Sequence, residues 1–242
     1  MQLGLLFSFW KSYMLKALVL SSGGVDSTTC LALAVDKLGA ENVSSVSIFY
    51  GQKHQKELLQ AKKIADYYKV NHYELDLSAM FAQSNCALLK NSTQEIEEST
   101  YKEQITAHGK VNTYVPFRNG LFLARVGSLA GSIYPDDKVE IYLGAHADDA
   151  AMNAYADCSK EFIEAMNRAI SIGTYSQENI VAPFAGKTKA EVVACGLKLK
   201  VPYELTWSCY EGMEKACGKC ATCLDRLKAF KSNGVKDPLD YA

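Results

Sequence analysis

Apolar and polar positions follow two recurring patterns along this chain of 242 residues. Short runs of aliphatic, β-branched and aromatic residues are typical of strands, and the most apolar runs are typical of a buried parallel sheet. The predicted strands cover residues 16–22, 42–52, 72–77 and 138–146. Other segments repeat apolar residues at helical spacing. The predicted helices cover residues 26–39, 54–70, 119–134, 159–173 and 187–201. Because strands alternate with helices, we expect an α/β fold with a doubly wound, mainly parallel sheet.

A long polar segment interrupts this pattern at residues 91–116. Its periodicity is weak, and loops of this length in compact domains are usually active-site lids or disordered segments. The segment leads directly into the apolar helix predicted at 119–134, so we expect it to act as a lid.

The two ends of the chain differ from this central pattern. Residues 1–13 are apolar, but they are too few to cross a bilayer and lack the charged start of a signal peptide. Met14 stands directly before the first strand, so we expect residues 1–13 to be an N-terminal extension and residues 14–205 to be the main domain. Residues 206–242 carry four of the eight cysteines and are expected to form a small metal-binding module.

The overall charge favours a small-molecule substrate. The chain has 26 Lys and Arg against 27 Asp and Glu, a net charge of −1. Nucleic-acid-binding domains usually carry a basic excess, so we expect no nucleic-acid partner. No stretch is apolar enough to predict a membrane span. The cysteines do not form the evenly spaced pattern of a small secreted scaffold, which favours a reducing, cytoplasmic location.

Residues 18–31, LVLSSGGVDSTTCL, have the layout of a phosphate-binding loop. A strand leads into two glycines and then into a helix, so that backbone N–H groups and hydroxyls can surround an anion, while a carboxylate can hold Mg²⁺. The loop lacks the lysine of a Walker loop and the glycine spacing of a dinucleotide fold. The candidate nucleotide-binding residues are Ser21, Ser22, Gly23, Gly24, Val25, Asp26, Ser27, Thr28, Thr29, Cys30 and Leu31.

Polar residues also follow two other predicted strands, in the stretches YGQKH (50–54) and GAHADD (144–149). Open parallel sheets bind ligands at the carboxyl ends of their strands. We therefore expect these stretches to meet the phosphate loop, with Asp149 the candidate for a Mg²⁺ or ribose contact.

Four cysteines near the C-terminus have metal-ligand spacing. Cys209, Cys217, Cys220 and Cys223 follow the pattern C-x₇-C-x₂-C-x₂-C. Four thiolates satisfy a tetrahedral ion and leave no position for water, so this pattern favours a closed, structural Zn²⁺ site. An iron–sulfur cluster or a redox dithiol is the alternative.

Together these stretches resemble a known family. SGGVDST is similar to the pyrophosphatase loop of enzymes that cleave ATP between its α- and β-phosphates. With YGQKH, VPFRNGLFLA (115–124), GAHADDAAMNAYADC (144–158) and TWSCYEGMEKACGKCATCLDR (206–226), the sequence resembles the 7-cyano-7-deazaguanine synthase family over nearly its whole length. Lys53 and Ala156 depart from the family pattern, which has arginine and proline there. The resemblance implies a Rossmann-like sheet of the adenine nucleotide alpha hydrolase type.

The resemblance also implies an activity. Members of this family convert 7-carboxy-7-deazaguanine and ammonia to the nitrile through an amide, and each step turns ATP into AMP and pyrophosphate. It implies Mg²⁺ with ATP, one structural Zn²⁺ per chain and a homodimer.

The expected catalytic residues are Asp26, Ser27, Arg118 and Lys189. A cation near the reacting phosphate stabilises developing charge, which favours Arg118 as a phosphate or carboxylate clamp. The expected substrate-binding residues are Gln52, Asn119, Asn153, Tyr155 and Asp157. A carboxylate matches the two donors of a guanine edge, although Asp157 could instead cap a helix.

Three rival functions remain open at this point. A relative could stop at the amide or ligate another amine. A tRNA thiolation enzyme would use ATP similarly, but it would need a catalytic thiol and a basic face. A zinc-ribbon module on a nucleotide-sensing domain would be no enzyme at all. The near-neutral net charge counts against the tRNA thiolation enzyme and against a zinc ribbon that binds RNA.

Overall fold

A five-stranded parallel sheet forms the centre of the molecule in the computed structural model, which describes residues 13–150, 154–212 and 214–242. The strands lie in the order β3-β2-β1-β4-β5. Their bounds are Leu15–Leu20 (β1), Val43–Phe49 (β2), Asn71–Asp76 (β3), Lys138–Tyr142 (β4) and Glu178–Val181 (β5). All four pairings are parallel, which confirms the predicted α/β fold with a doubly wound sheet.

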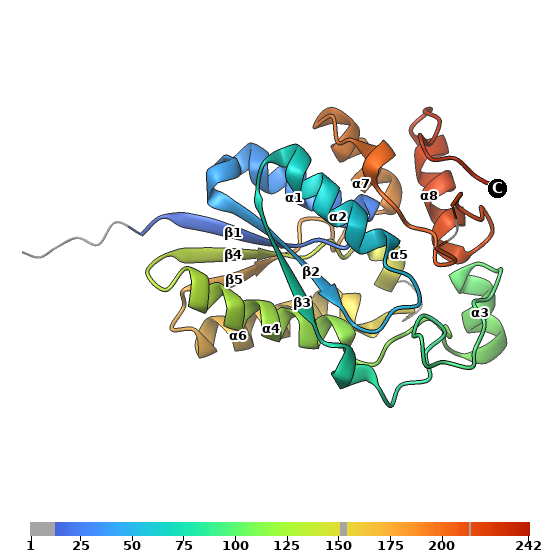
Figure 1. The fold of residues 1–242 in the computed structure, drawn as a ribbon, viewed down its shortest axis with the longest axis horizontal. Helices are drawn as coiled ribbons and strands as arrows, with labels where there is room; N and C mark the ends of the chain where they lie inside the picture. The colour runs from blue at the N-terminus through green and yellow to red at the C-terminus, as the bar shows by residue number, and fades with distance from the viewer. Residues whose placement is uncertain (1–12, 151–153, 213) are drawn as a thin grey trace, which may run out of the picture.

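Helices cover both faces of this sheet (Figure 1). Helices α1, α2 and α7 lie on one face, and α4 and α6 lie on the other. The helix bounds are Val25–Leu38 (α1), Lys56–Tyr68 (α2), Tyr101–His108 (α3), Arg118–Ile133 (α4), Ala147–Ala150 (α5), Lys160–Gly173 (α6), Lys189–Lys198 (α7) and Ala221–Ser232 (α8). The two apolar layers explain why β1 and β2 read as continuous apolar or small-residue runs, since both of their faces are buried.

The strand order reverses between β1 and β4, and the loops after these two strands meet there. Gly144, just after β4, packs against the backbone of α1: a Cβ atom at this position would lie 2.9 Å from the amide nitrogen of Ser27. Glycine therefore permits the close approach of the two loops. Such a reversal opens a crevice at the carboxyl ends of the strands, where ligands of this fold class bind.

Four of these strands and helices were not predicted from the sequence: β5, α3, the short helix α5 and α8 of the C-terminal segment. Strand β5 was not predicted, because it is only four residues long and begins with Glu178, whose charge is atypical of a buried strand. The polar segment 91–116 contains α3, which begins with a complete capping box between Thr100 and Glu103. Helix α3 lies beside the C-terminal part of the chain (Figure 1).

The C-terminal residues share the main hydrophobic core. Ala229 and Phe230 of α8 are buried in the same cluster as β1, α1 and α7. The fully buried guanidinium of Arg226 donates to both carboxylate oxygens of Asp237, at 2.7 and 3.0 Å. The expected module 206–242 is thus packed onto the main domain.

Residues 1–12 of the expected N-terminal extension lie outside the described residues. Among the helices of the described ranges, none has the length and apolar character needed to cross a bilayer.

Candidate active site and metal site

A cavity of about 230 Å³ lies at the carboxyl ends of the strands. Its walls come from the loop after β1, the loop after β2, the start of α4, the loop after β4, the start of α7 and the loop before α8. Many of the expected site residues line this cavity: Ser21, Ser22, Gly24, Asp26, Ser27, Gln52, Arg118, Asn119, Tyr155 and Lys189. The fold therefore brings together residues that are far apart in sequence.

The phosphate loop has the geometry of an anion cradle. Gly23 adopts φ +82°, and a Cβ there would lie 2.3 Å from the carbonyl oxygen of Glu57, so glycine is required. Gly24 caps α1 without any side-chain hydrogen bond to the first turn. The Ser27 hydroxyl accepts from the amide of Ser22 at 3.2 Å and donates to the carbonyl of Gly24 at 3.3 Å. The amides at the start of α1 thus carry no side-chain cap and can face a phosphate.

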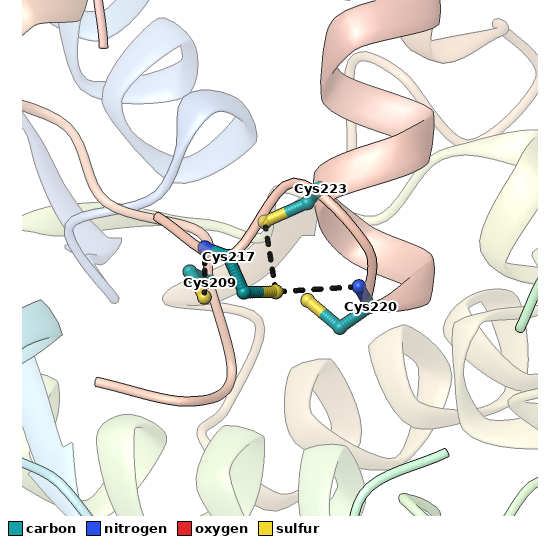
Figure 2. A group of neighbouring side chains, drawn as sticks. All are labelled: Cys209, Cys217, Cys220 and Cys223. Atoms are coloured by element: carbon teal, nitrogen blue, oxygen red, sulfur yellow. Dashed lines mark hydrogen bonds between the residues drawn. The ribbon is translucent and has the colours of Figure 1, made fainter. Parts of the chain in front are cut away.

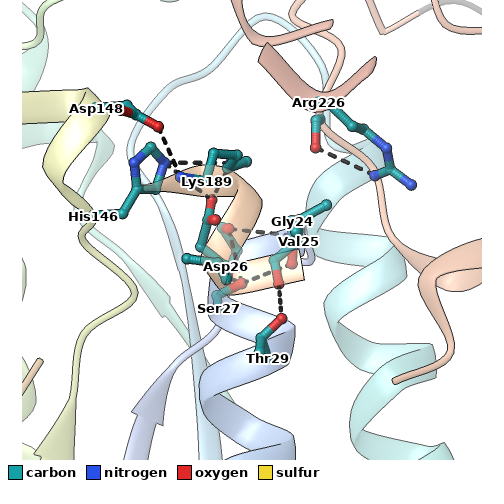
Figure 3. Close-up of polar contacts among 12 residues, drawn as sticks. Gly24, Val25, Asp26, Ser27, Thr29, His146, Asp148, Lys189 and Arg226 are labelled. Atoms are coloured by element: carbon teal, nitrogen blue, oxygen red, sulfur yellow. Dashed lines mark hydrogen bonds and ion pairs between the residues drawn. The ribbon is translucent and has the colours of Figure 1, made fainter. Parts of the chain in front are cut away.

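Asp26 and Lys189 form an ion pair in this part of the cavity (Figure 3). His146 Nε2 lies 3.8 Å from Oδ2 of Asp26, and the Lys189 backbone amide donates to Asp148 at 2.7 Å. Burial opposes the charge of Asp26, but Lys189 and His146 outweigh it and lower the pKa of this carboxyl. The other oxygen, Oδ1, is buried and has no hydrogen-bond partner among the described residues. An ionised carboxylate with an unpartnered oxygen fits a ligand to Mg²⁺.

Five residues of the predicted loop do not line the cavity with their side chains. Val25, Cys30 and Leu31 are fully buried in the core beneath it. The Thr29 hydroxyl donates to the carbonyl of Val25 at 2.7 Å and bonds Tyr203 at 2.9 Å. These side chains hold α1 against its neighbours. The Thr28 hydroxyl donates to the carbonyl of Gly24 at 2.7 Å.

The opposite part of the cavity is aromatic. Tyr50 and Phe122 line it, and the guanidinium of Arg118 lies over their rings, 5.4 and 5.9 Å from the ring centres. Burial opposes the Arg118 charge, but Tyr50, Cys158 and Asp157 outweigh it and raise the pKa of Arg118. A permanent cation between aromatic rings can pair with the carboxylate of a planar ligand.

Three expected substrate contacts, Asp157, Gln52 and Asn119, form hydrogen bonds within the protein itself. Asp157 is buried and accepts a hydrogen bond from the Asn119 amide at 2.9 Å, so it holds the first turn of α4 rather than the helix that follows it. Gln52 accepts from the amide of Tyr50 at 2.9 Å. The Asn119 side chain donates to the carbonyl of Asp157 at 3.3 Å. Asn153 lies outside the described residues, as does the side chain of Asp149.

A chain of hydroxyls joins the expected lid to the rest of the cavity. Tyr155 bonds Thr113 at 2.7 Å and Tyr210 at 3.4 Å, and Tyr210 bonds Tyr101 of α3 at 2.8 Å. The rings of Tyr101 and Tyr155 also meet edge to face, with their centres 5.5 Å apart. Helix α3 is thus attached to the cavity wall through side chains of two other segments.

Sequence reasoning missed several residues that line the cavity. These are Glu57, Tyr101, Trp207 and Tyr210. The stretch YGQKH leads straight into α2, so Glu57 could have been found by extending that motif by one helical turn. Tyr210 directly follows a metal-ligand cysteine, and nothing local in the sequence indicates that its ring enters the cavity.

The four cysteines form a separate site at the start of α8 (Figure 2). Their sulfur atoms all lie within 4.8 Å of one another, and those of Cys217 and Cys223 are 4.0 Å apart. A tetrahedral ion with bonds of about 2.3 Å to sulfur holds the sulfurs about 3.8 Å apart. The backbone amides of Lys219 and Cys220 donate to the Cys217 sulfur at 3.4 and 3.3 Å. The residues present can therefore hold a metal ion.

Gly218 provides the turn between two of these ligands, with φ +72°. Hydrogen bonds from Cys220 and Cys223 hold the pKa of the Cys209 thiol well below its usual range, so a thiolate is favoured there. The side chains of the metal ligands do not line the cavity, but Ser208 and Tyr210 on either side of Cys209 do. The cluster of four cysteines thus lies next to part of the cavity wall.

The family model and the curated relatives match almost the whole chain. The family model described as queuosine biosynthesis protein QueC matches residues 16–234. A 7-cyano-7-deazaguanine synthase from Caldicellulosiruptor saccharolyticus is 42% identical, over 94% of this chain and 96% of the relative. A protein of the same name from Archaeoglobus fulgidus is 40% identical, over 93% of this chain and 90% of the relative. Among solved structures, NMN synthetase from Francisella tularensis is 14% identical with a TM-score of 0.49, over 91% of this chain and 78% of that one.

Proposed function

Because the chain belongs to the family of queuosine biosynthesis protein QueC, we propose that it is an AMP-forming ligase that converts 7-carboxy-7-deazaguanine and ammonia to 7-cyano-7-deazaguanine. The observation that carries this proposal is the division of one cavity into two parts. One part is a phosphate loop with the Asp26–Lys189 pair, and the other is an aromatic wall with Arg118. A nucleotide phosphate suits the first part, and a planar base that bears a carboxylate suits the second.

The proposed chemistry begins with activation of the carboxylate. Its oxygen attacks the α-phosphorus of ATP, and pyrophosphate leaves along the loop from Ser22 to Ser27. The amides at the start of α1 and the Lys189 ammonium stabilise the charge that develops on the phosphate oxygens. Arg118 orients the substrate carboxylate, so that the two reactants meet without further reorganisation.

Ammonia then displaces AMP and gives the amide. A second adenylation, on the amide oxygen, allows loss of AMP and formation of the nitrile. The amide oxygen is a weak nucleophile, so the intermediate must stay bound where water is excluded. The hydroxyl chain that ties α3 to Tyr155 and Tyr210 provides such a closure.

Two metal sites belong to this proposal. Asp26 Oδ1 would be the protein ligand of the Mg²⁺ that accompanies ATP and neutralises phosphate charge. Cys209, Cys217, Cys220 and Cys223 would hold one Zn²⁺ with a purely structural role, because four thiolates complete its coordination. The proposal also includes a homodimer and a cytoplasmic location, in which the eight cysteines stay reduced.

The test is a reaction with 7-carboxy-7-deazaguanine, ammonium chloride and Mg-ATP, with the base product identified by mass and AMP counted against it. We expect the nitrile, with one AMP for each of the two adenylations. One AMP per turnover with only amide as product would mean that the enzyme stops at the amide and does not form the nitrile. AMP formation that is independent of the base would overturn the proposed substrate.

A further inference from the structure

Glu57 occupies a position in the cavity that the proposed chemistry has not yet used. It is the second residue of α2, and its side chain lines the cavity. Its backbone carbonyl packs directly against Gly23 of the phosphate loop. Because both ends of this contact are backbone, Glu57 is held at a fixed place beside the nucleotide-binding part of the cavity.

The side chain of Glu57 has no structural task within the described residues. No hydrogen bond or ion pair between it and another described residue is present, whereas Asp26, the second carboxylate of the cavity wall, is bonded to Lys189. A partly buried carboxylate without a partner is costly to keep charged. Burial accordingly raises the pKa of Glu57 to about 8, although Arg118 and Lys189 act against this. The carboxylate is therefore a stronger base than an ordinary glutamate, and a cation bound beside it favours its ionised form.

The surroundings of Glu57 join the two parts of the cavity. Arg118 belongs to the aromatic part and Lys189 to the phosphate part, and the charges of both act on the Glu57 carboxylate. In the proposed intermediate, the bond that must break connects the carboxyl carbon of the base to the phosphate of AMP. This bond would therefore lie between the two parts of the cavity, whose wall Glu57 helps to form.

The nucleophile for this bond is a cation in its resting form. At neutral pH ammonia is present almost entirely as ammonium, which has no lone pair and must lose a proton before it can attack. Lys189 and Arg118 repel ammonium from their own surroundings. A carboxylate with free acceptor oxygens is the group that both attracts this cation and takes its proton.

We propose that Glu57 binds ammonium and accepts its proton, which makes it a catalytic residue of the amide-forming step; the inference rests on the proposed function. One N–H bond of ammonium breaks and its proton passes to the carboxylate. The nitrogen lone pair then forms the C–N bond, and the C–O bond to AMP breaks with its electron pair on the phosphate oxygen. The attached nitrogen loses its second proton to the departing AMP, and Glu57 returns its proton to solvent.

The experiment compares full-length wild-type protein with Glu57→Gln, which keeps the size of the side chain but neither attracts a cation nor takes a proton. Asp66→Asn, an exposed position of the same helix, is the matched control. Adenylation alone is followed as pyrophosphate–ATP exchange dependent on 7-carboxy-7-deazaguanine. The second step is followed with two nucleophiles: ammonium, and hydroxylamine, which is uncharged at neutral pH and needs no proton acceptor to attack.

We expect Glu57→Gln to lower kcat/KM for ammonium by about 10²- to 10⁴-fold, the usual contribution of a positioned base, while exchange and hydroxamate formation stay at the wild-type rate. If the variant folds poorly, Glu57→Ala with added formate takes its place, and restored use of ammonium supports the inference. Equal losses with both nucleophiles overturn the inference, as does an equal loss of exchange, which would assign Glu57 to the nucleotide. Absence of exchange in the wild type overturns the proposed function and the inference with it.

Discussion

The ammonium group of Lys189 donates a hydrogen bond to Oδ2 of Asp26, a residue 163 positions earlier in the chain. Lys189 begins α7, whose start is fixed by a capping box between Thr188 and Glu191. Its backbone amide is bonded to Asp148, in the short helix after the loop that follows β4. One residue thus connects the ends of β1 and β4, the strands between which the cavity opens.

Replacement of Lys189 by methionine should impair adenylation without unfolding the protein. Without the ammonium group, the largest effect that opposes burial is lost, so the pKa of Asp26 should rise. Loss of a charge that stabilises the transition state costs about 10²- to 10³-fold in rate. Lys187→Met, two positions earlier and exposed, is the control. Pyrophosphate release measures the effect, and equal rates for the two variants would contradict this role of Lys189.

Lys189→Met should also change how the free energy of unfolding depends on pH, because Lys189 lowers the pKa of Asp26. A carboxyl whose folded-state pKa is lowered contributes stability above its unfolded pKa, here near the ordinary value of 3.8, and this stability is lost as pH falls through the lower value. We expect Lys189→Met to lose part of this contribution at neutral pH. Urea unfolding at neutral pH and in acid measures the difference from wild type, which should shrink in acid.

Cys217→Ser should remove the metal and lower thermal stability before it changes the chemistry. Metal binding at such a site contributes folding free energy, and an alcohol is a poor substitute for a thiolate. Elemental analysis should give one zinc per wild-type chain and less in the variant. Cys195→Ser, away from the cluster, should keep full zinc. Iron in freshly purified wild-type protein would contradict the assignment of zinc.

Tyr101→Phe should release the amide intermediate. The substitution removes the hydroxyl that bonds Tyr210 but keeps the ring against Tyr155, so α3 loses one attachment of about 0.5–1.5 kcal/mol. We expect the ratio of amide to nitrile in the product to rise, while the first AMP forms at the wild-type rate. Tyr175→Phe changes a tyrosine that is 93% exposed and serves as the control. An unchanged product ratio would show that this bond does not hold the lid.

Asp237→Ala should destabilise the whole domain. The guanidinium of Arg226 is completely buried, and removal of its partner leaves an uncompensated charge, which costs about 3–5 kcal/mol. Urea denaturation gives the free energy of unfolding. Glu98→Gln breaks the exposed ion pair with Lys219 and should leave that free energy unchanged. A small effect of Asp237→Ala would mean that the C-terminal segment unfolds independently of the sheet.

Glu178 should make stability fall as pH rises. It is buried beneath α4, where Cβ atoms at Gly127 and Gly131 would lie 3.0 and 3.1 Å from its oxygens. Burial raises its pKa from 4.5 to about 7, so the folded state holds a proton that the unfolded state releases. Stability is therefore fully present below about pH 4.5 and declines up to about pH 7, by on the order of 3 kcal/mol.

Glu178→Gln should flatten this part of the stability profile, because glutamine carries no charge at any pH. Glu164→Gln, an exposed change on α6, should keep the wild-type profile. Urea unfolding at pH 5 and pH 8 provides the comparison. The same slope in wild type and in Glu178→Gln would assign the pH dependence to another group.

Local chemistry made the fold class and the local geometry of two candidate sites predictable. The Gly-Gly turn and the following helix start specify an anion cradle because backbone conformation and amide direction depend on neighbouring residues. The cysteine spacing specifies a metal site for the same reason, since the short turn at Gly218 brings two sulfurs together. Periodicity placed the long helices and the first four strands, because each must bury one stripe or both faces.

The tertiary structure decided which groups single polar side chains contact. Asp157 reads equally well as a substrate contact or a helix cap, and only the packing of its loop on α4 turns it toward the amide of Asn119. From the sequence, Glu57 is an ordinary surface residue of an amphipathic helix. The packing of α2 against Gly23 places it in the cavity wall. Strand β5 is too short to show a period, and it is stabilised by its pairing with β4. Propensities and spacing act over one or two turns, whereas these positions depend on the order in which distant strands meet.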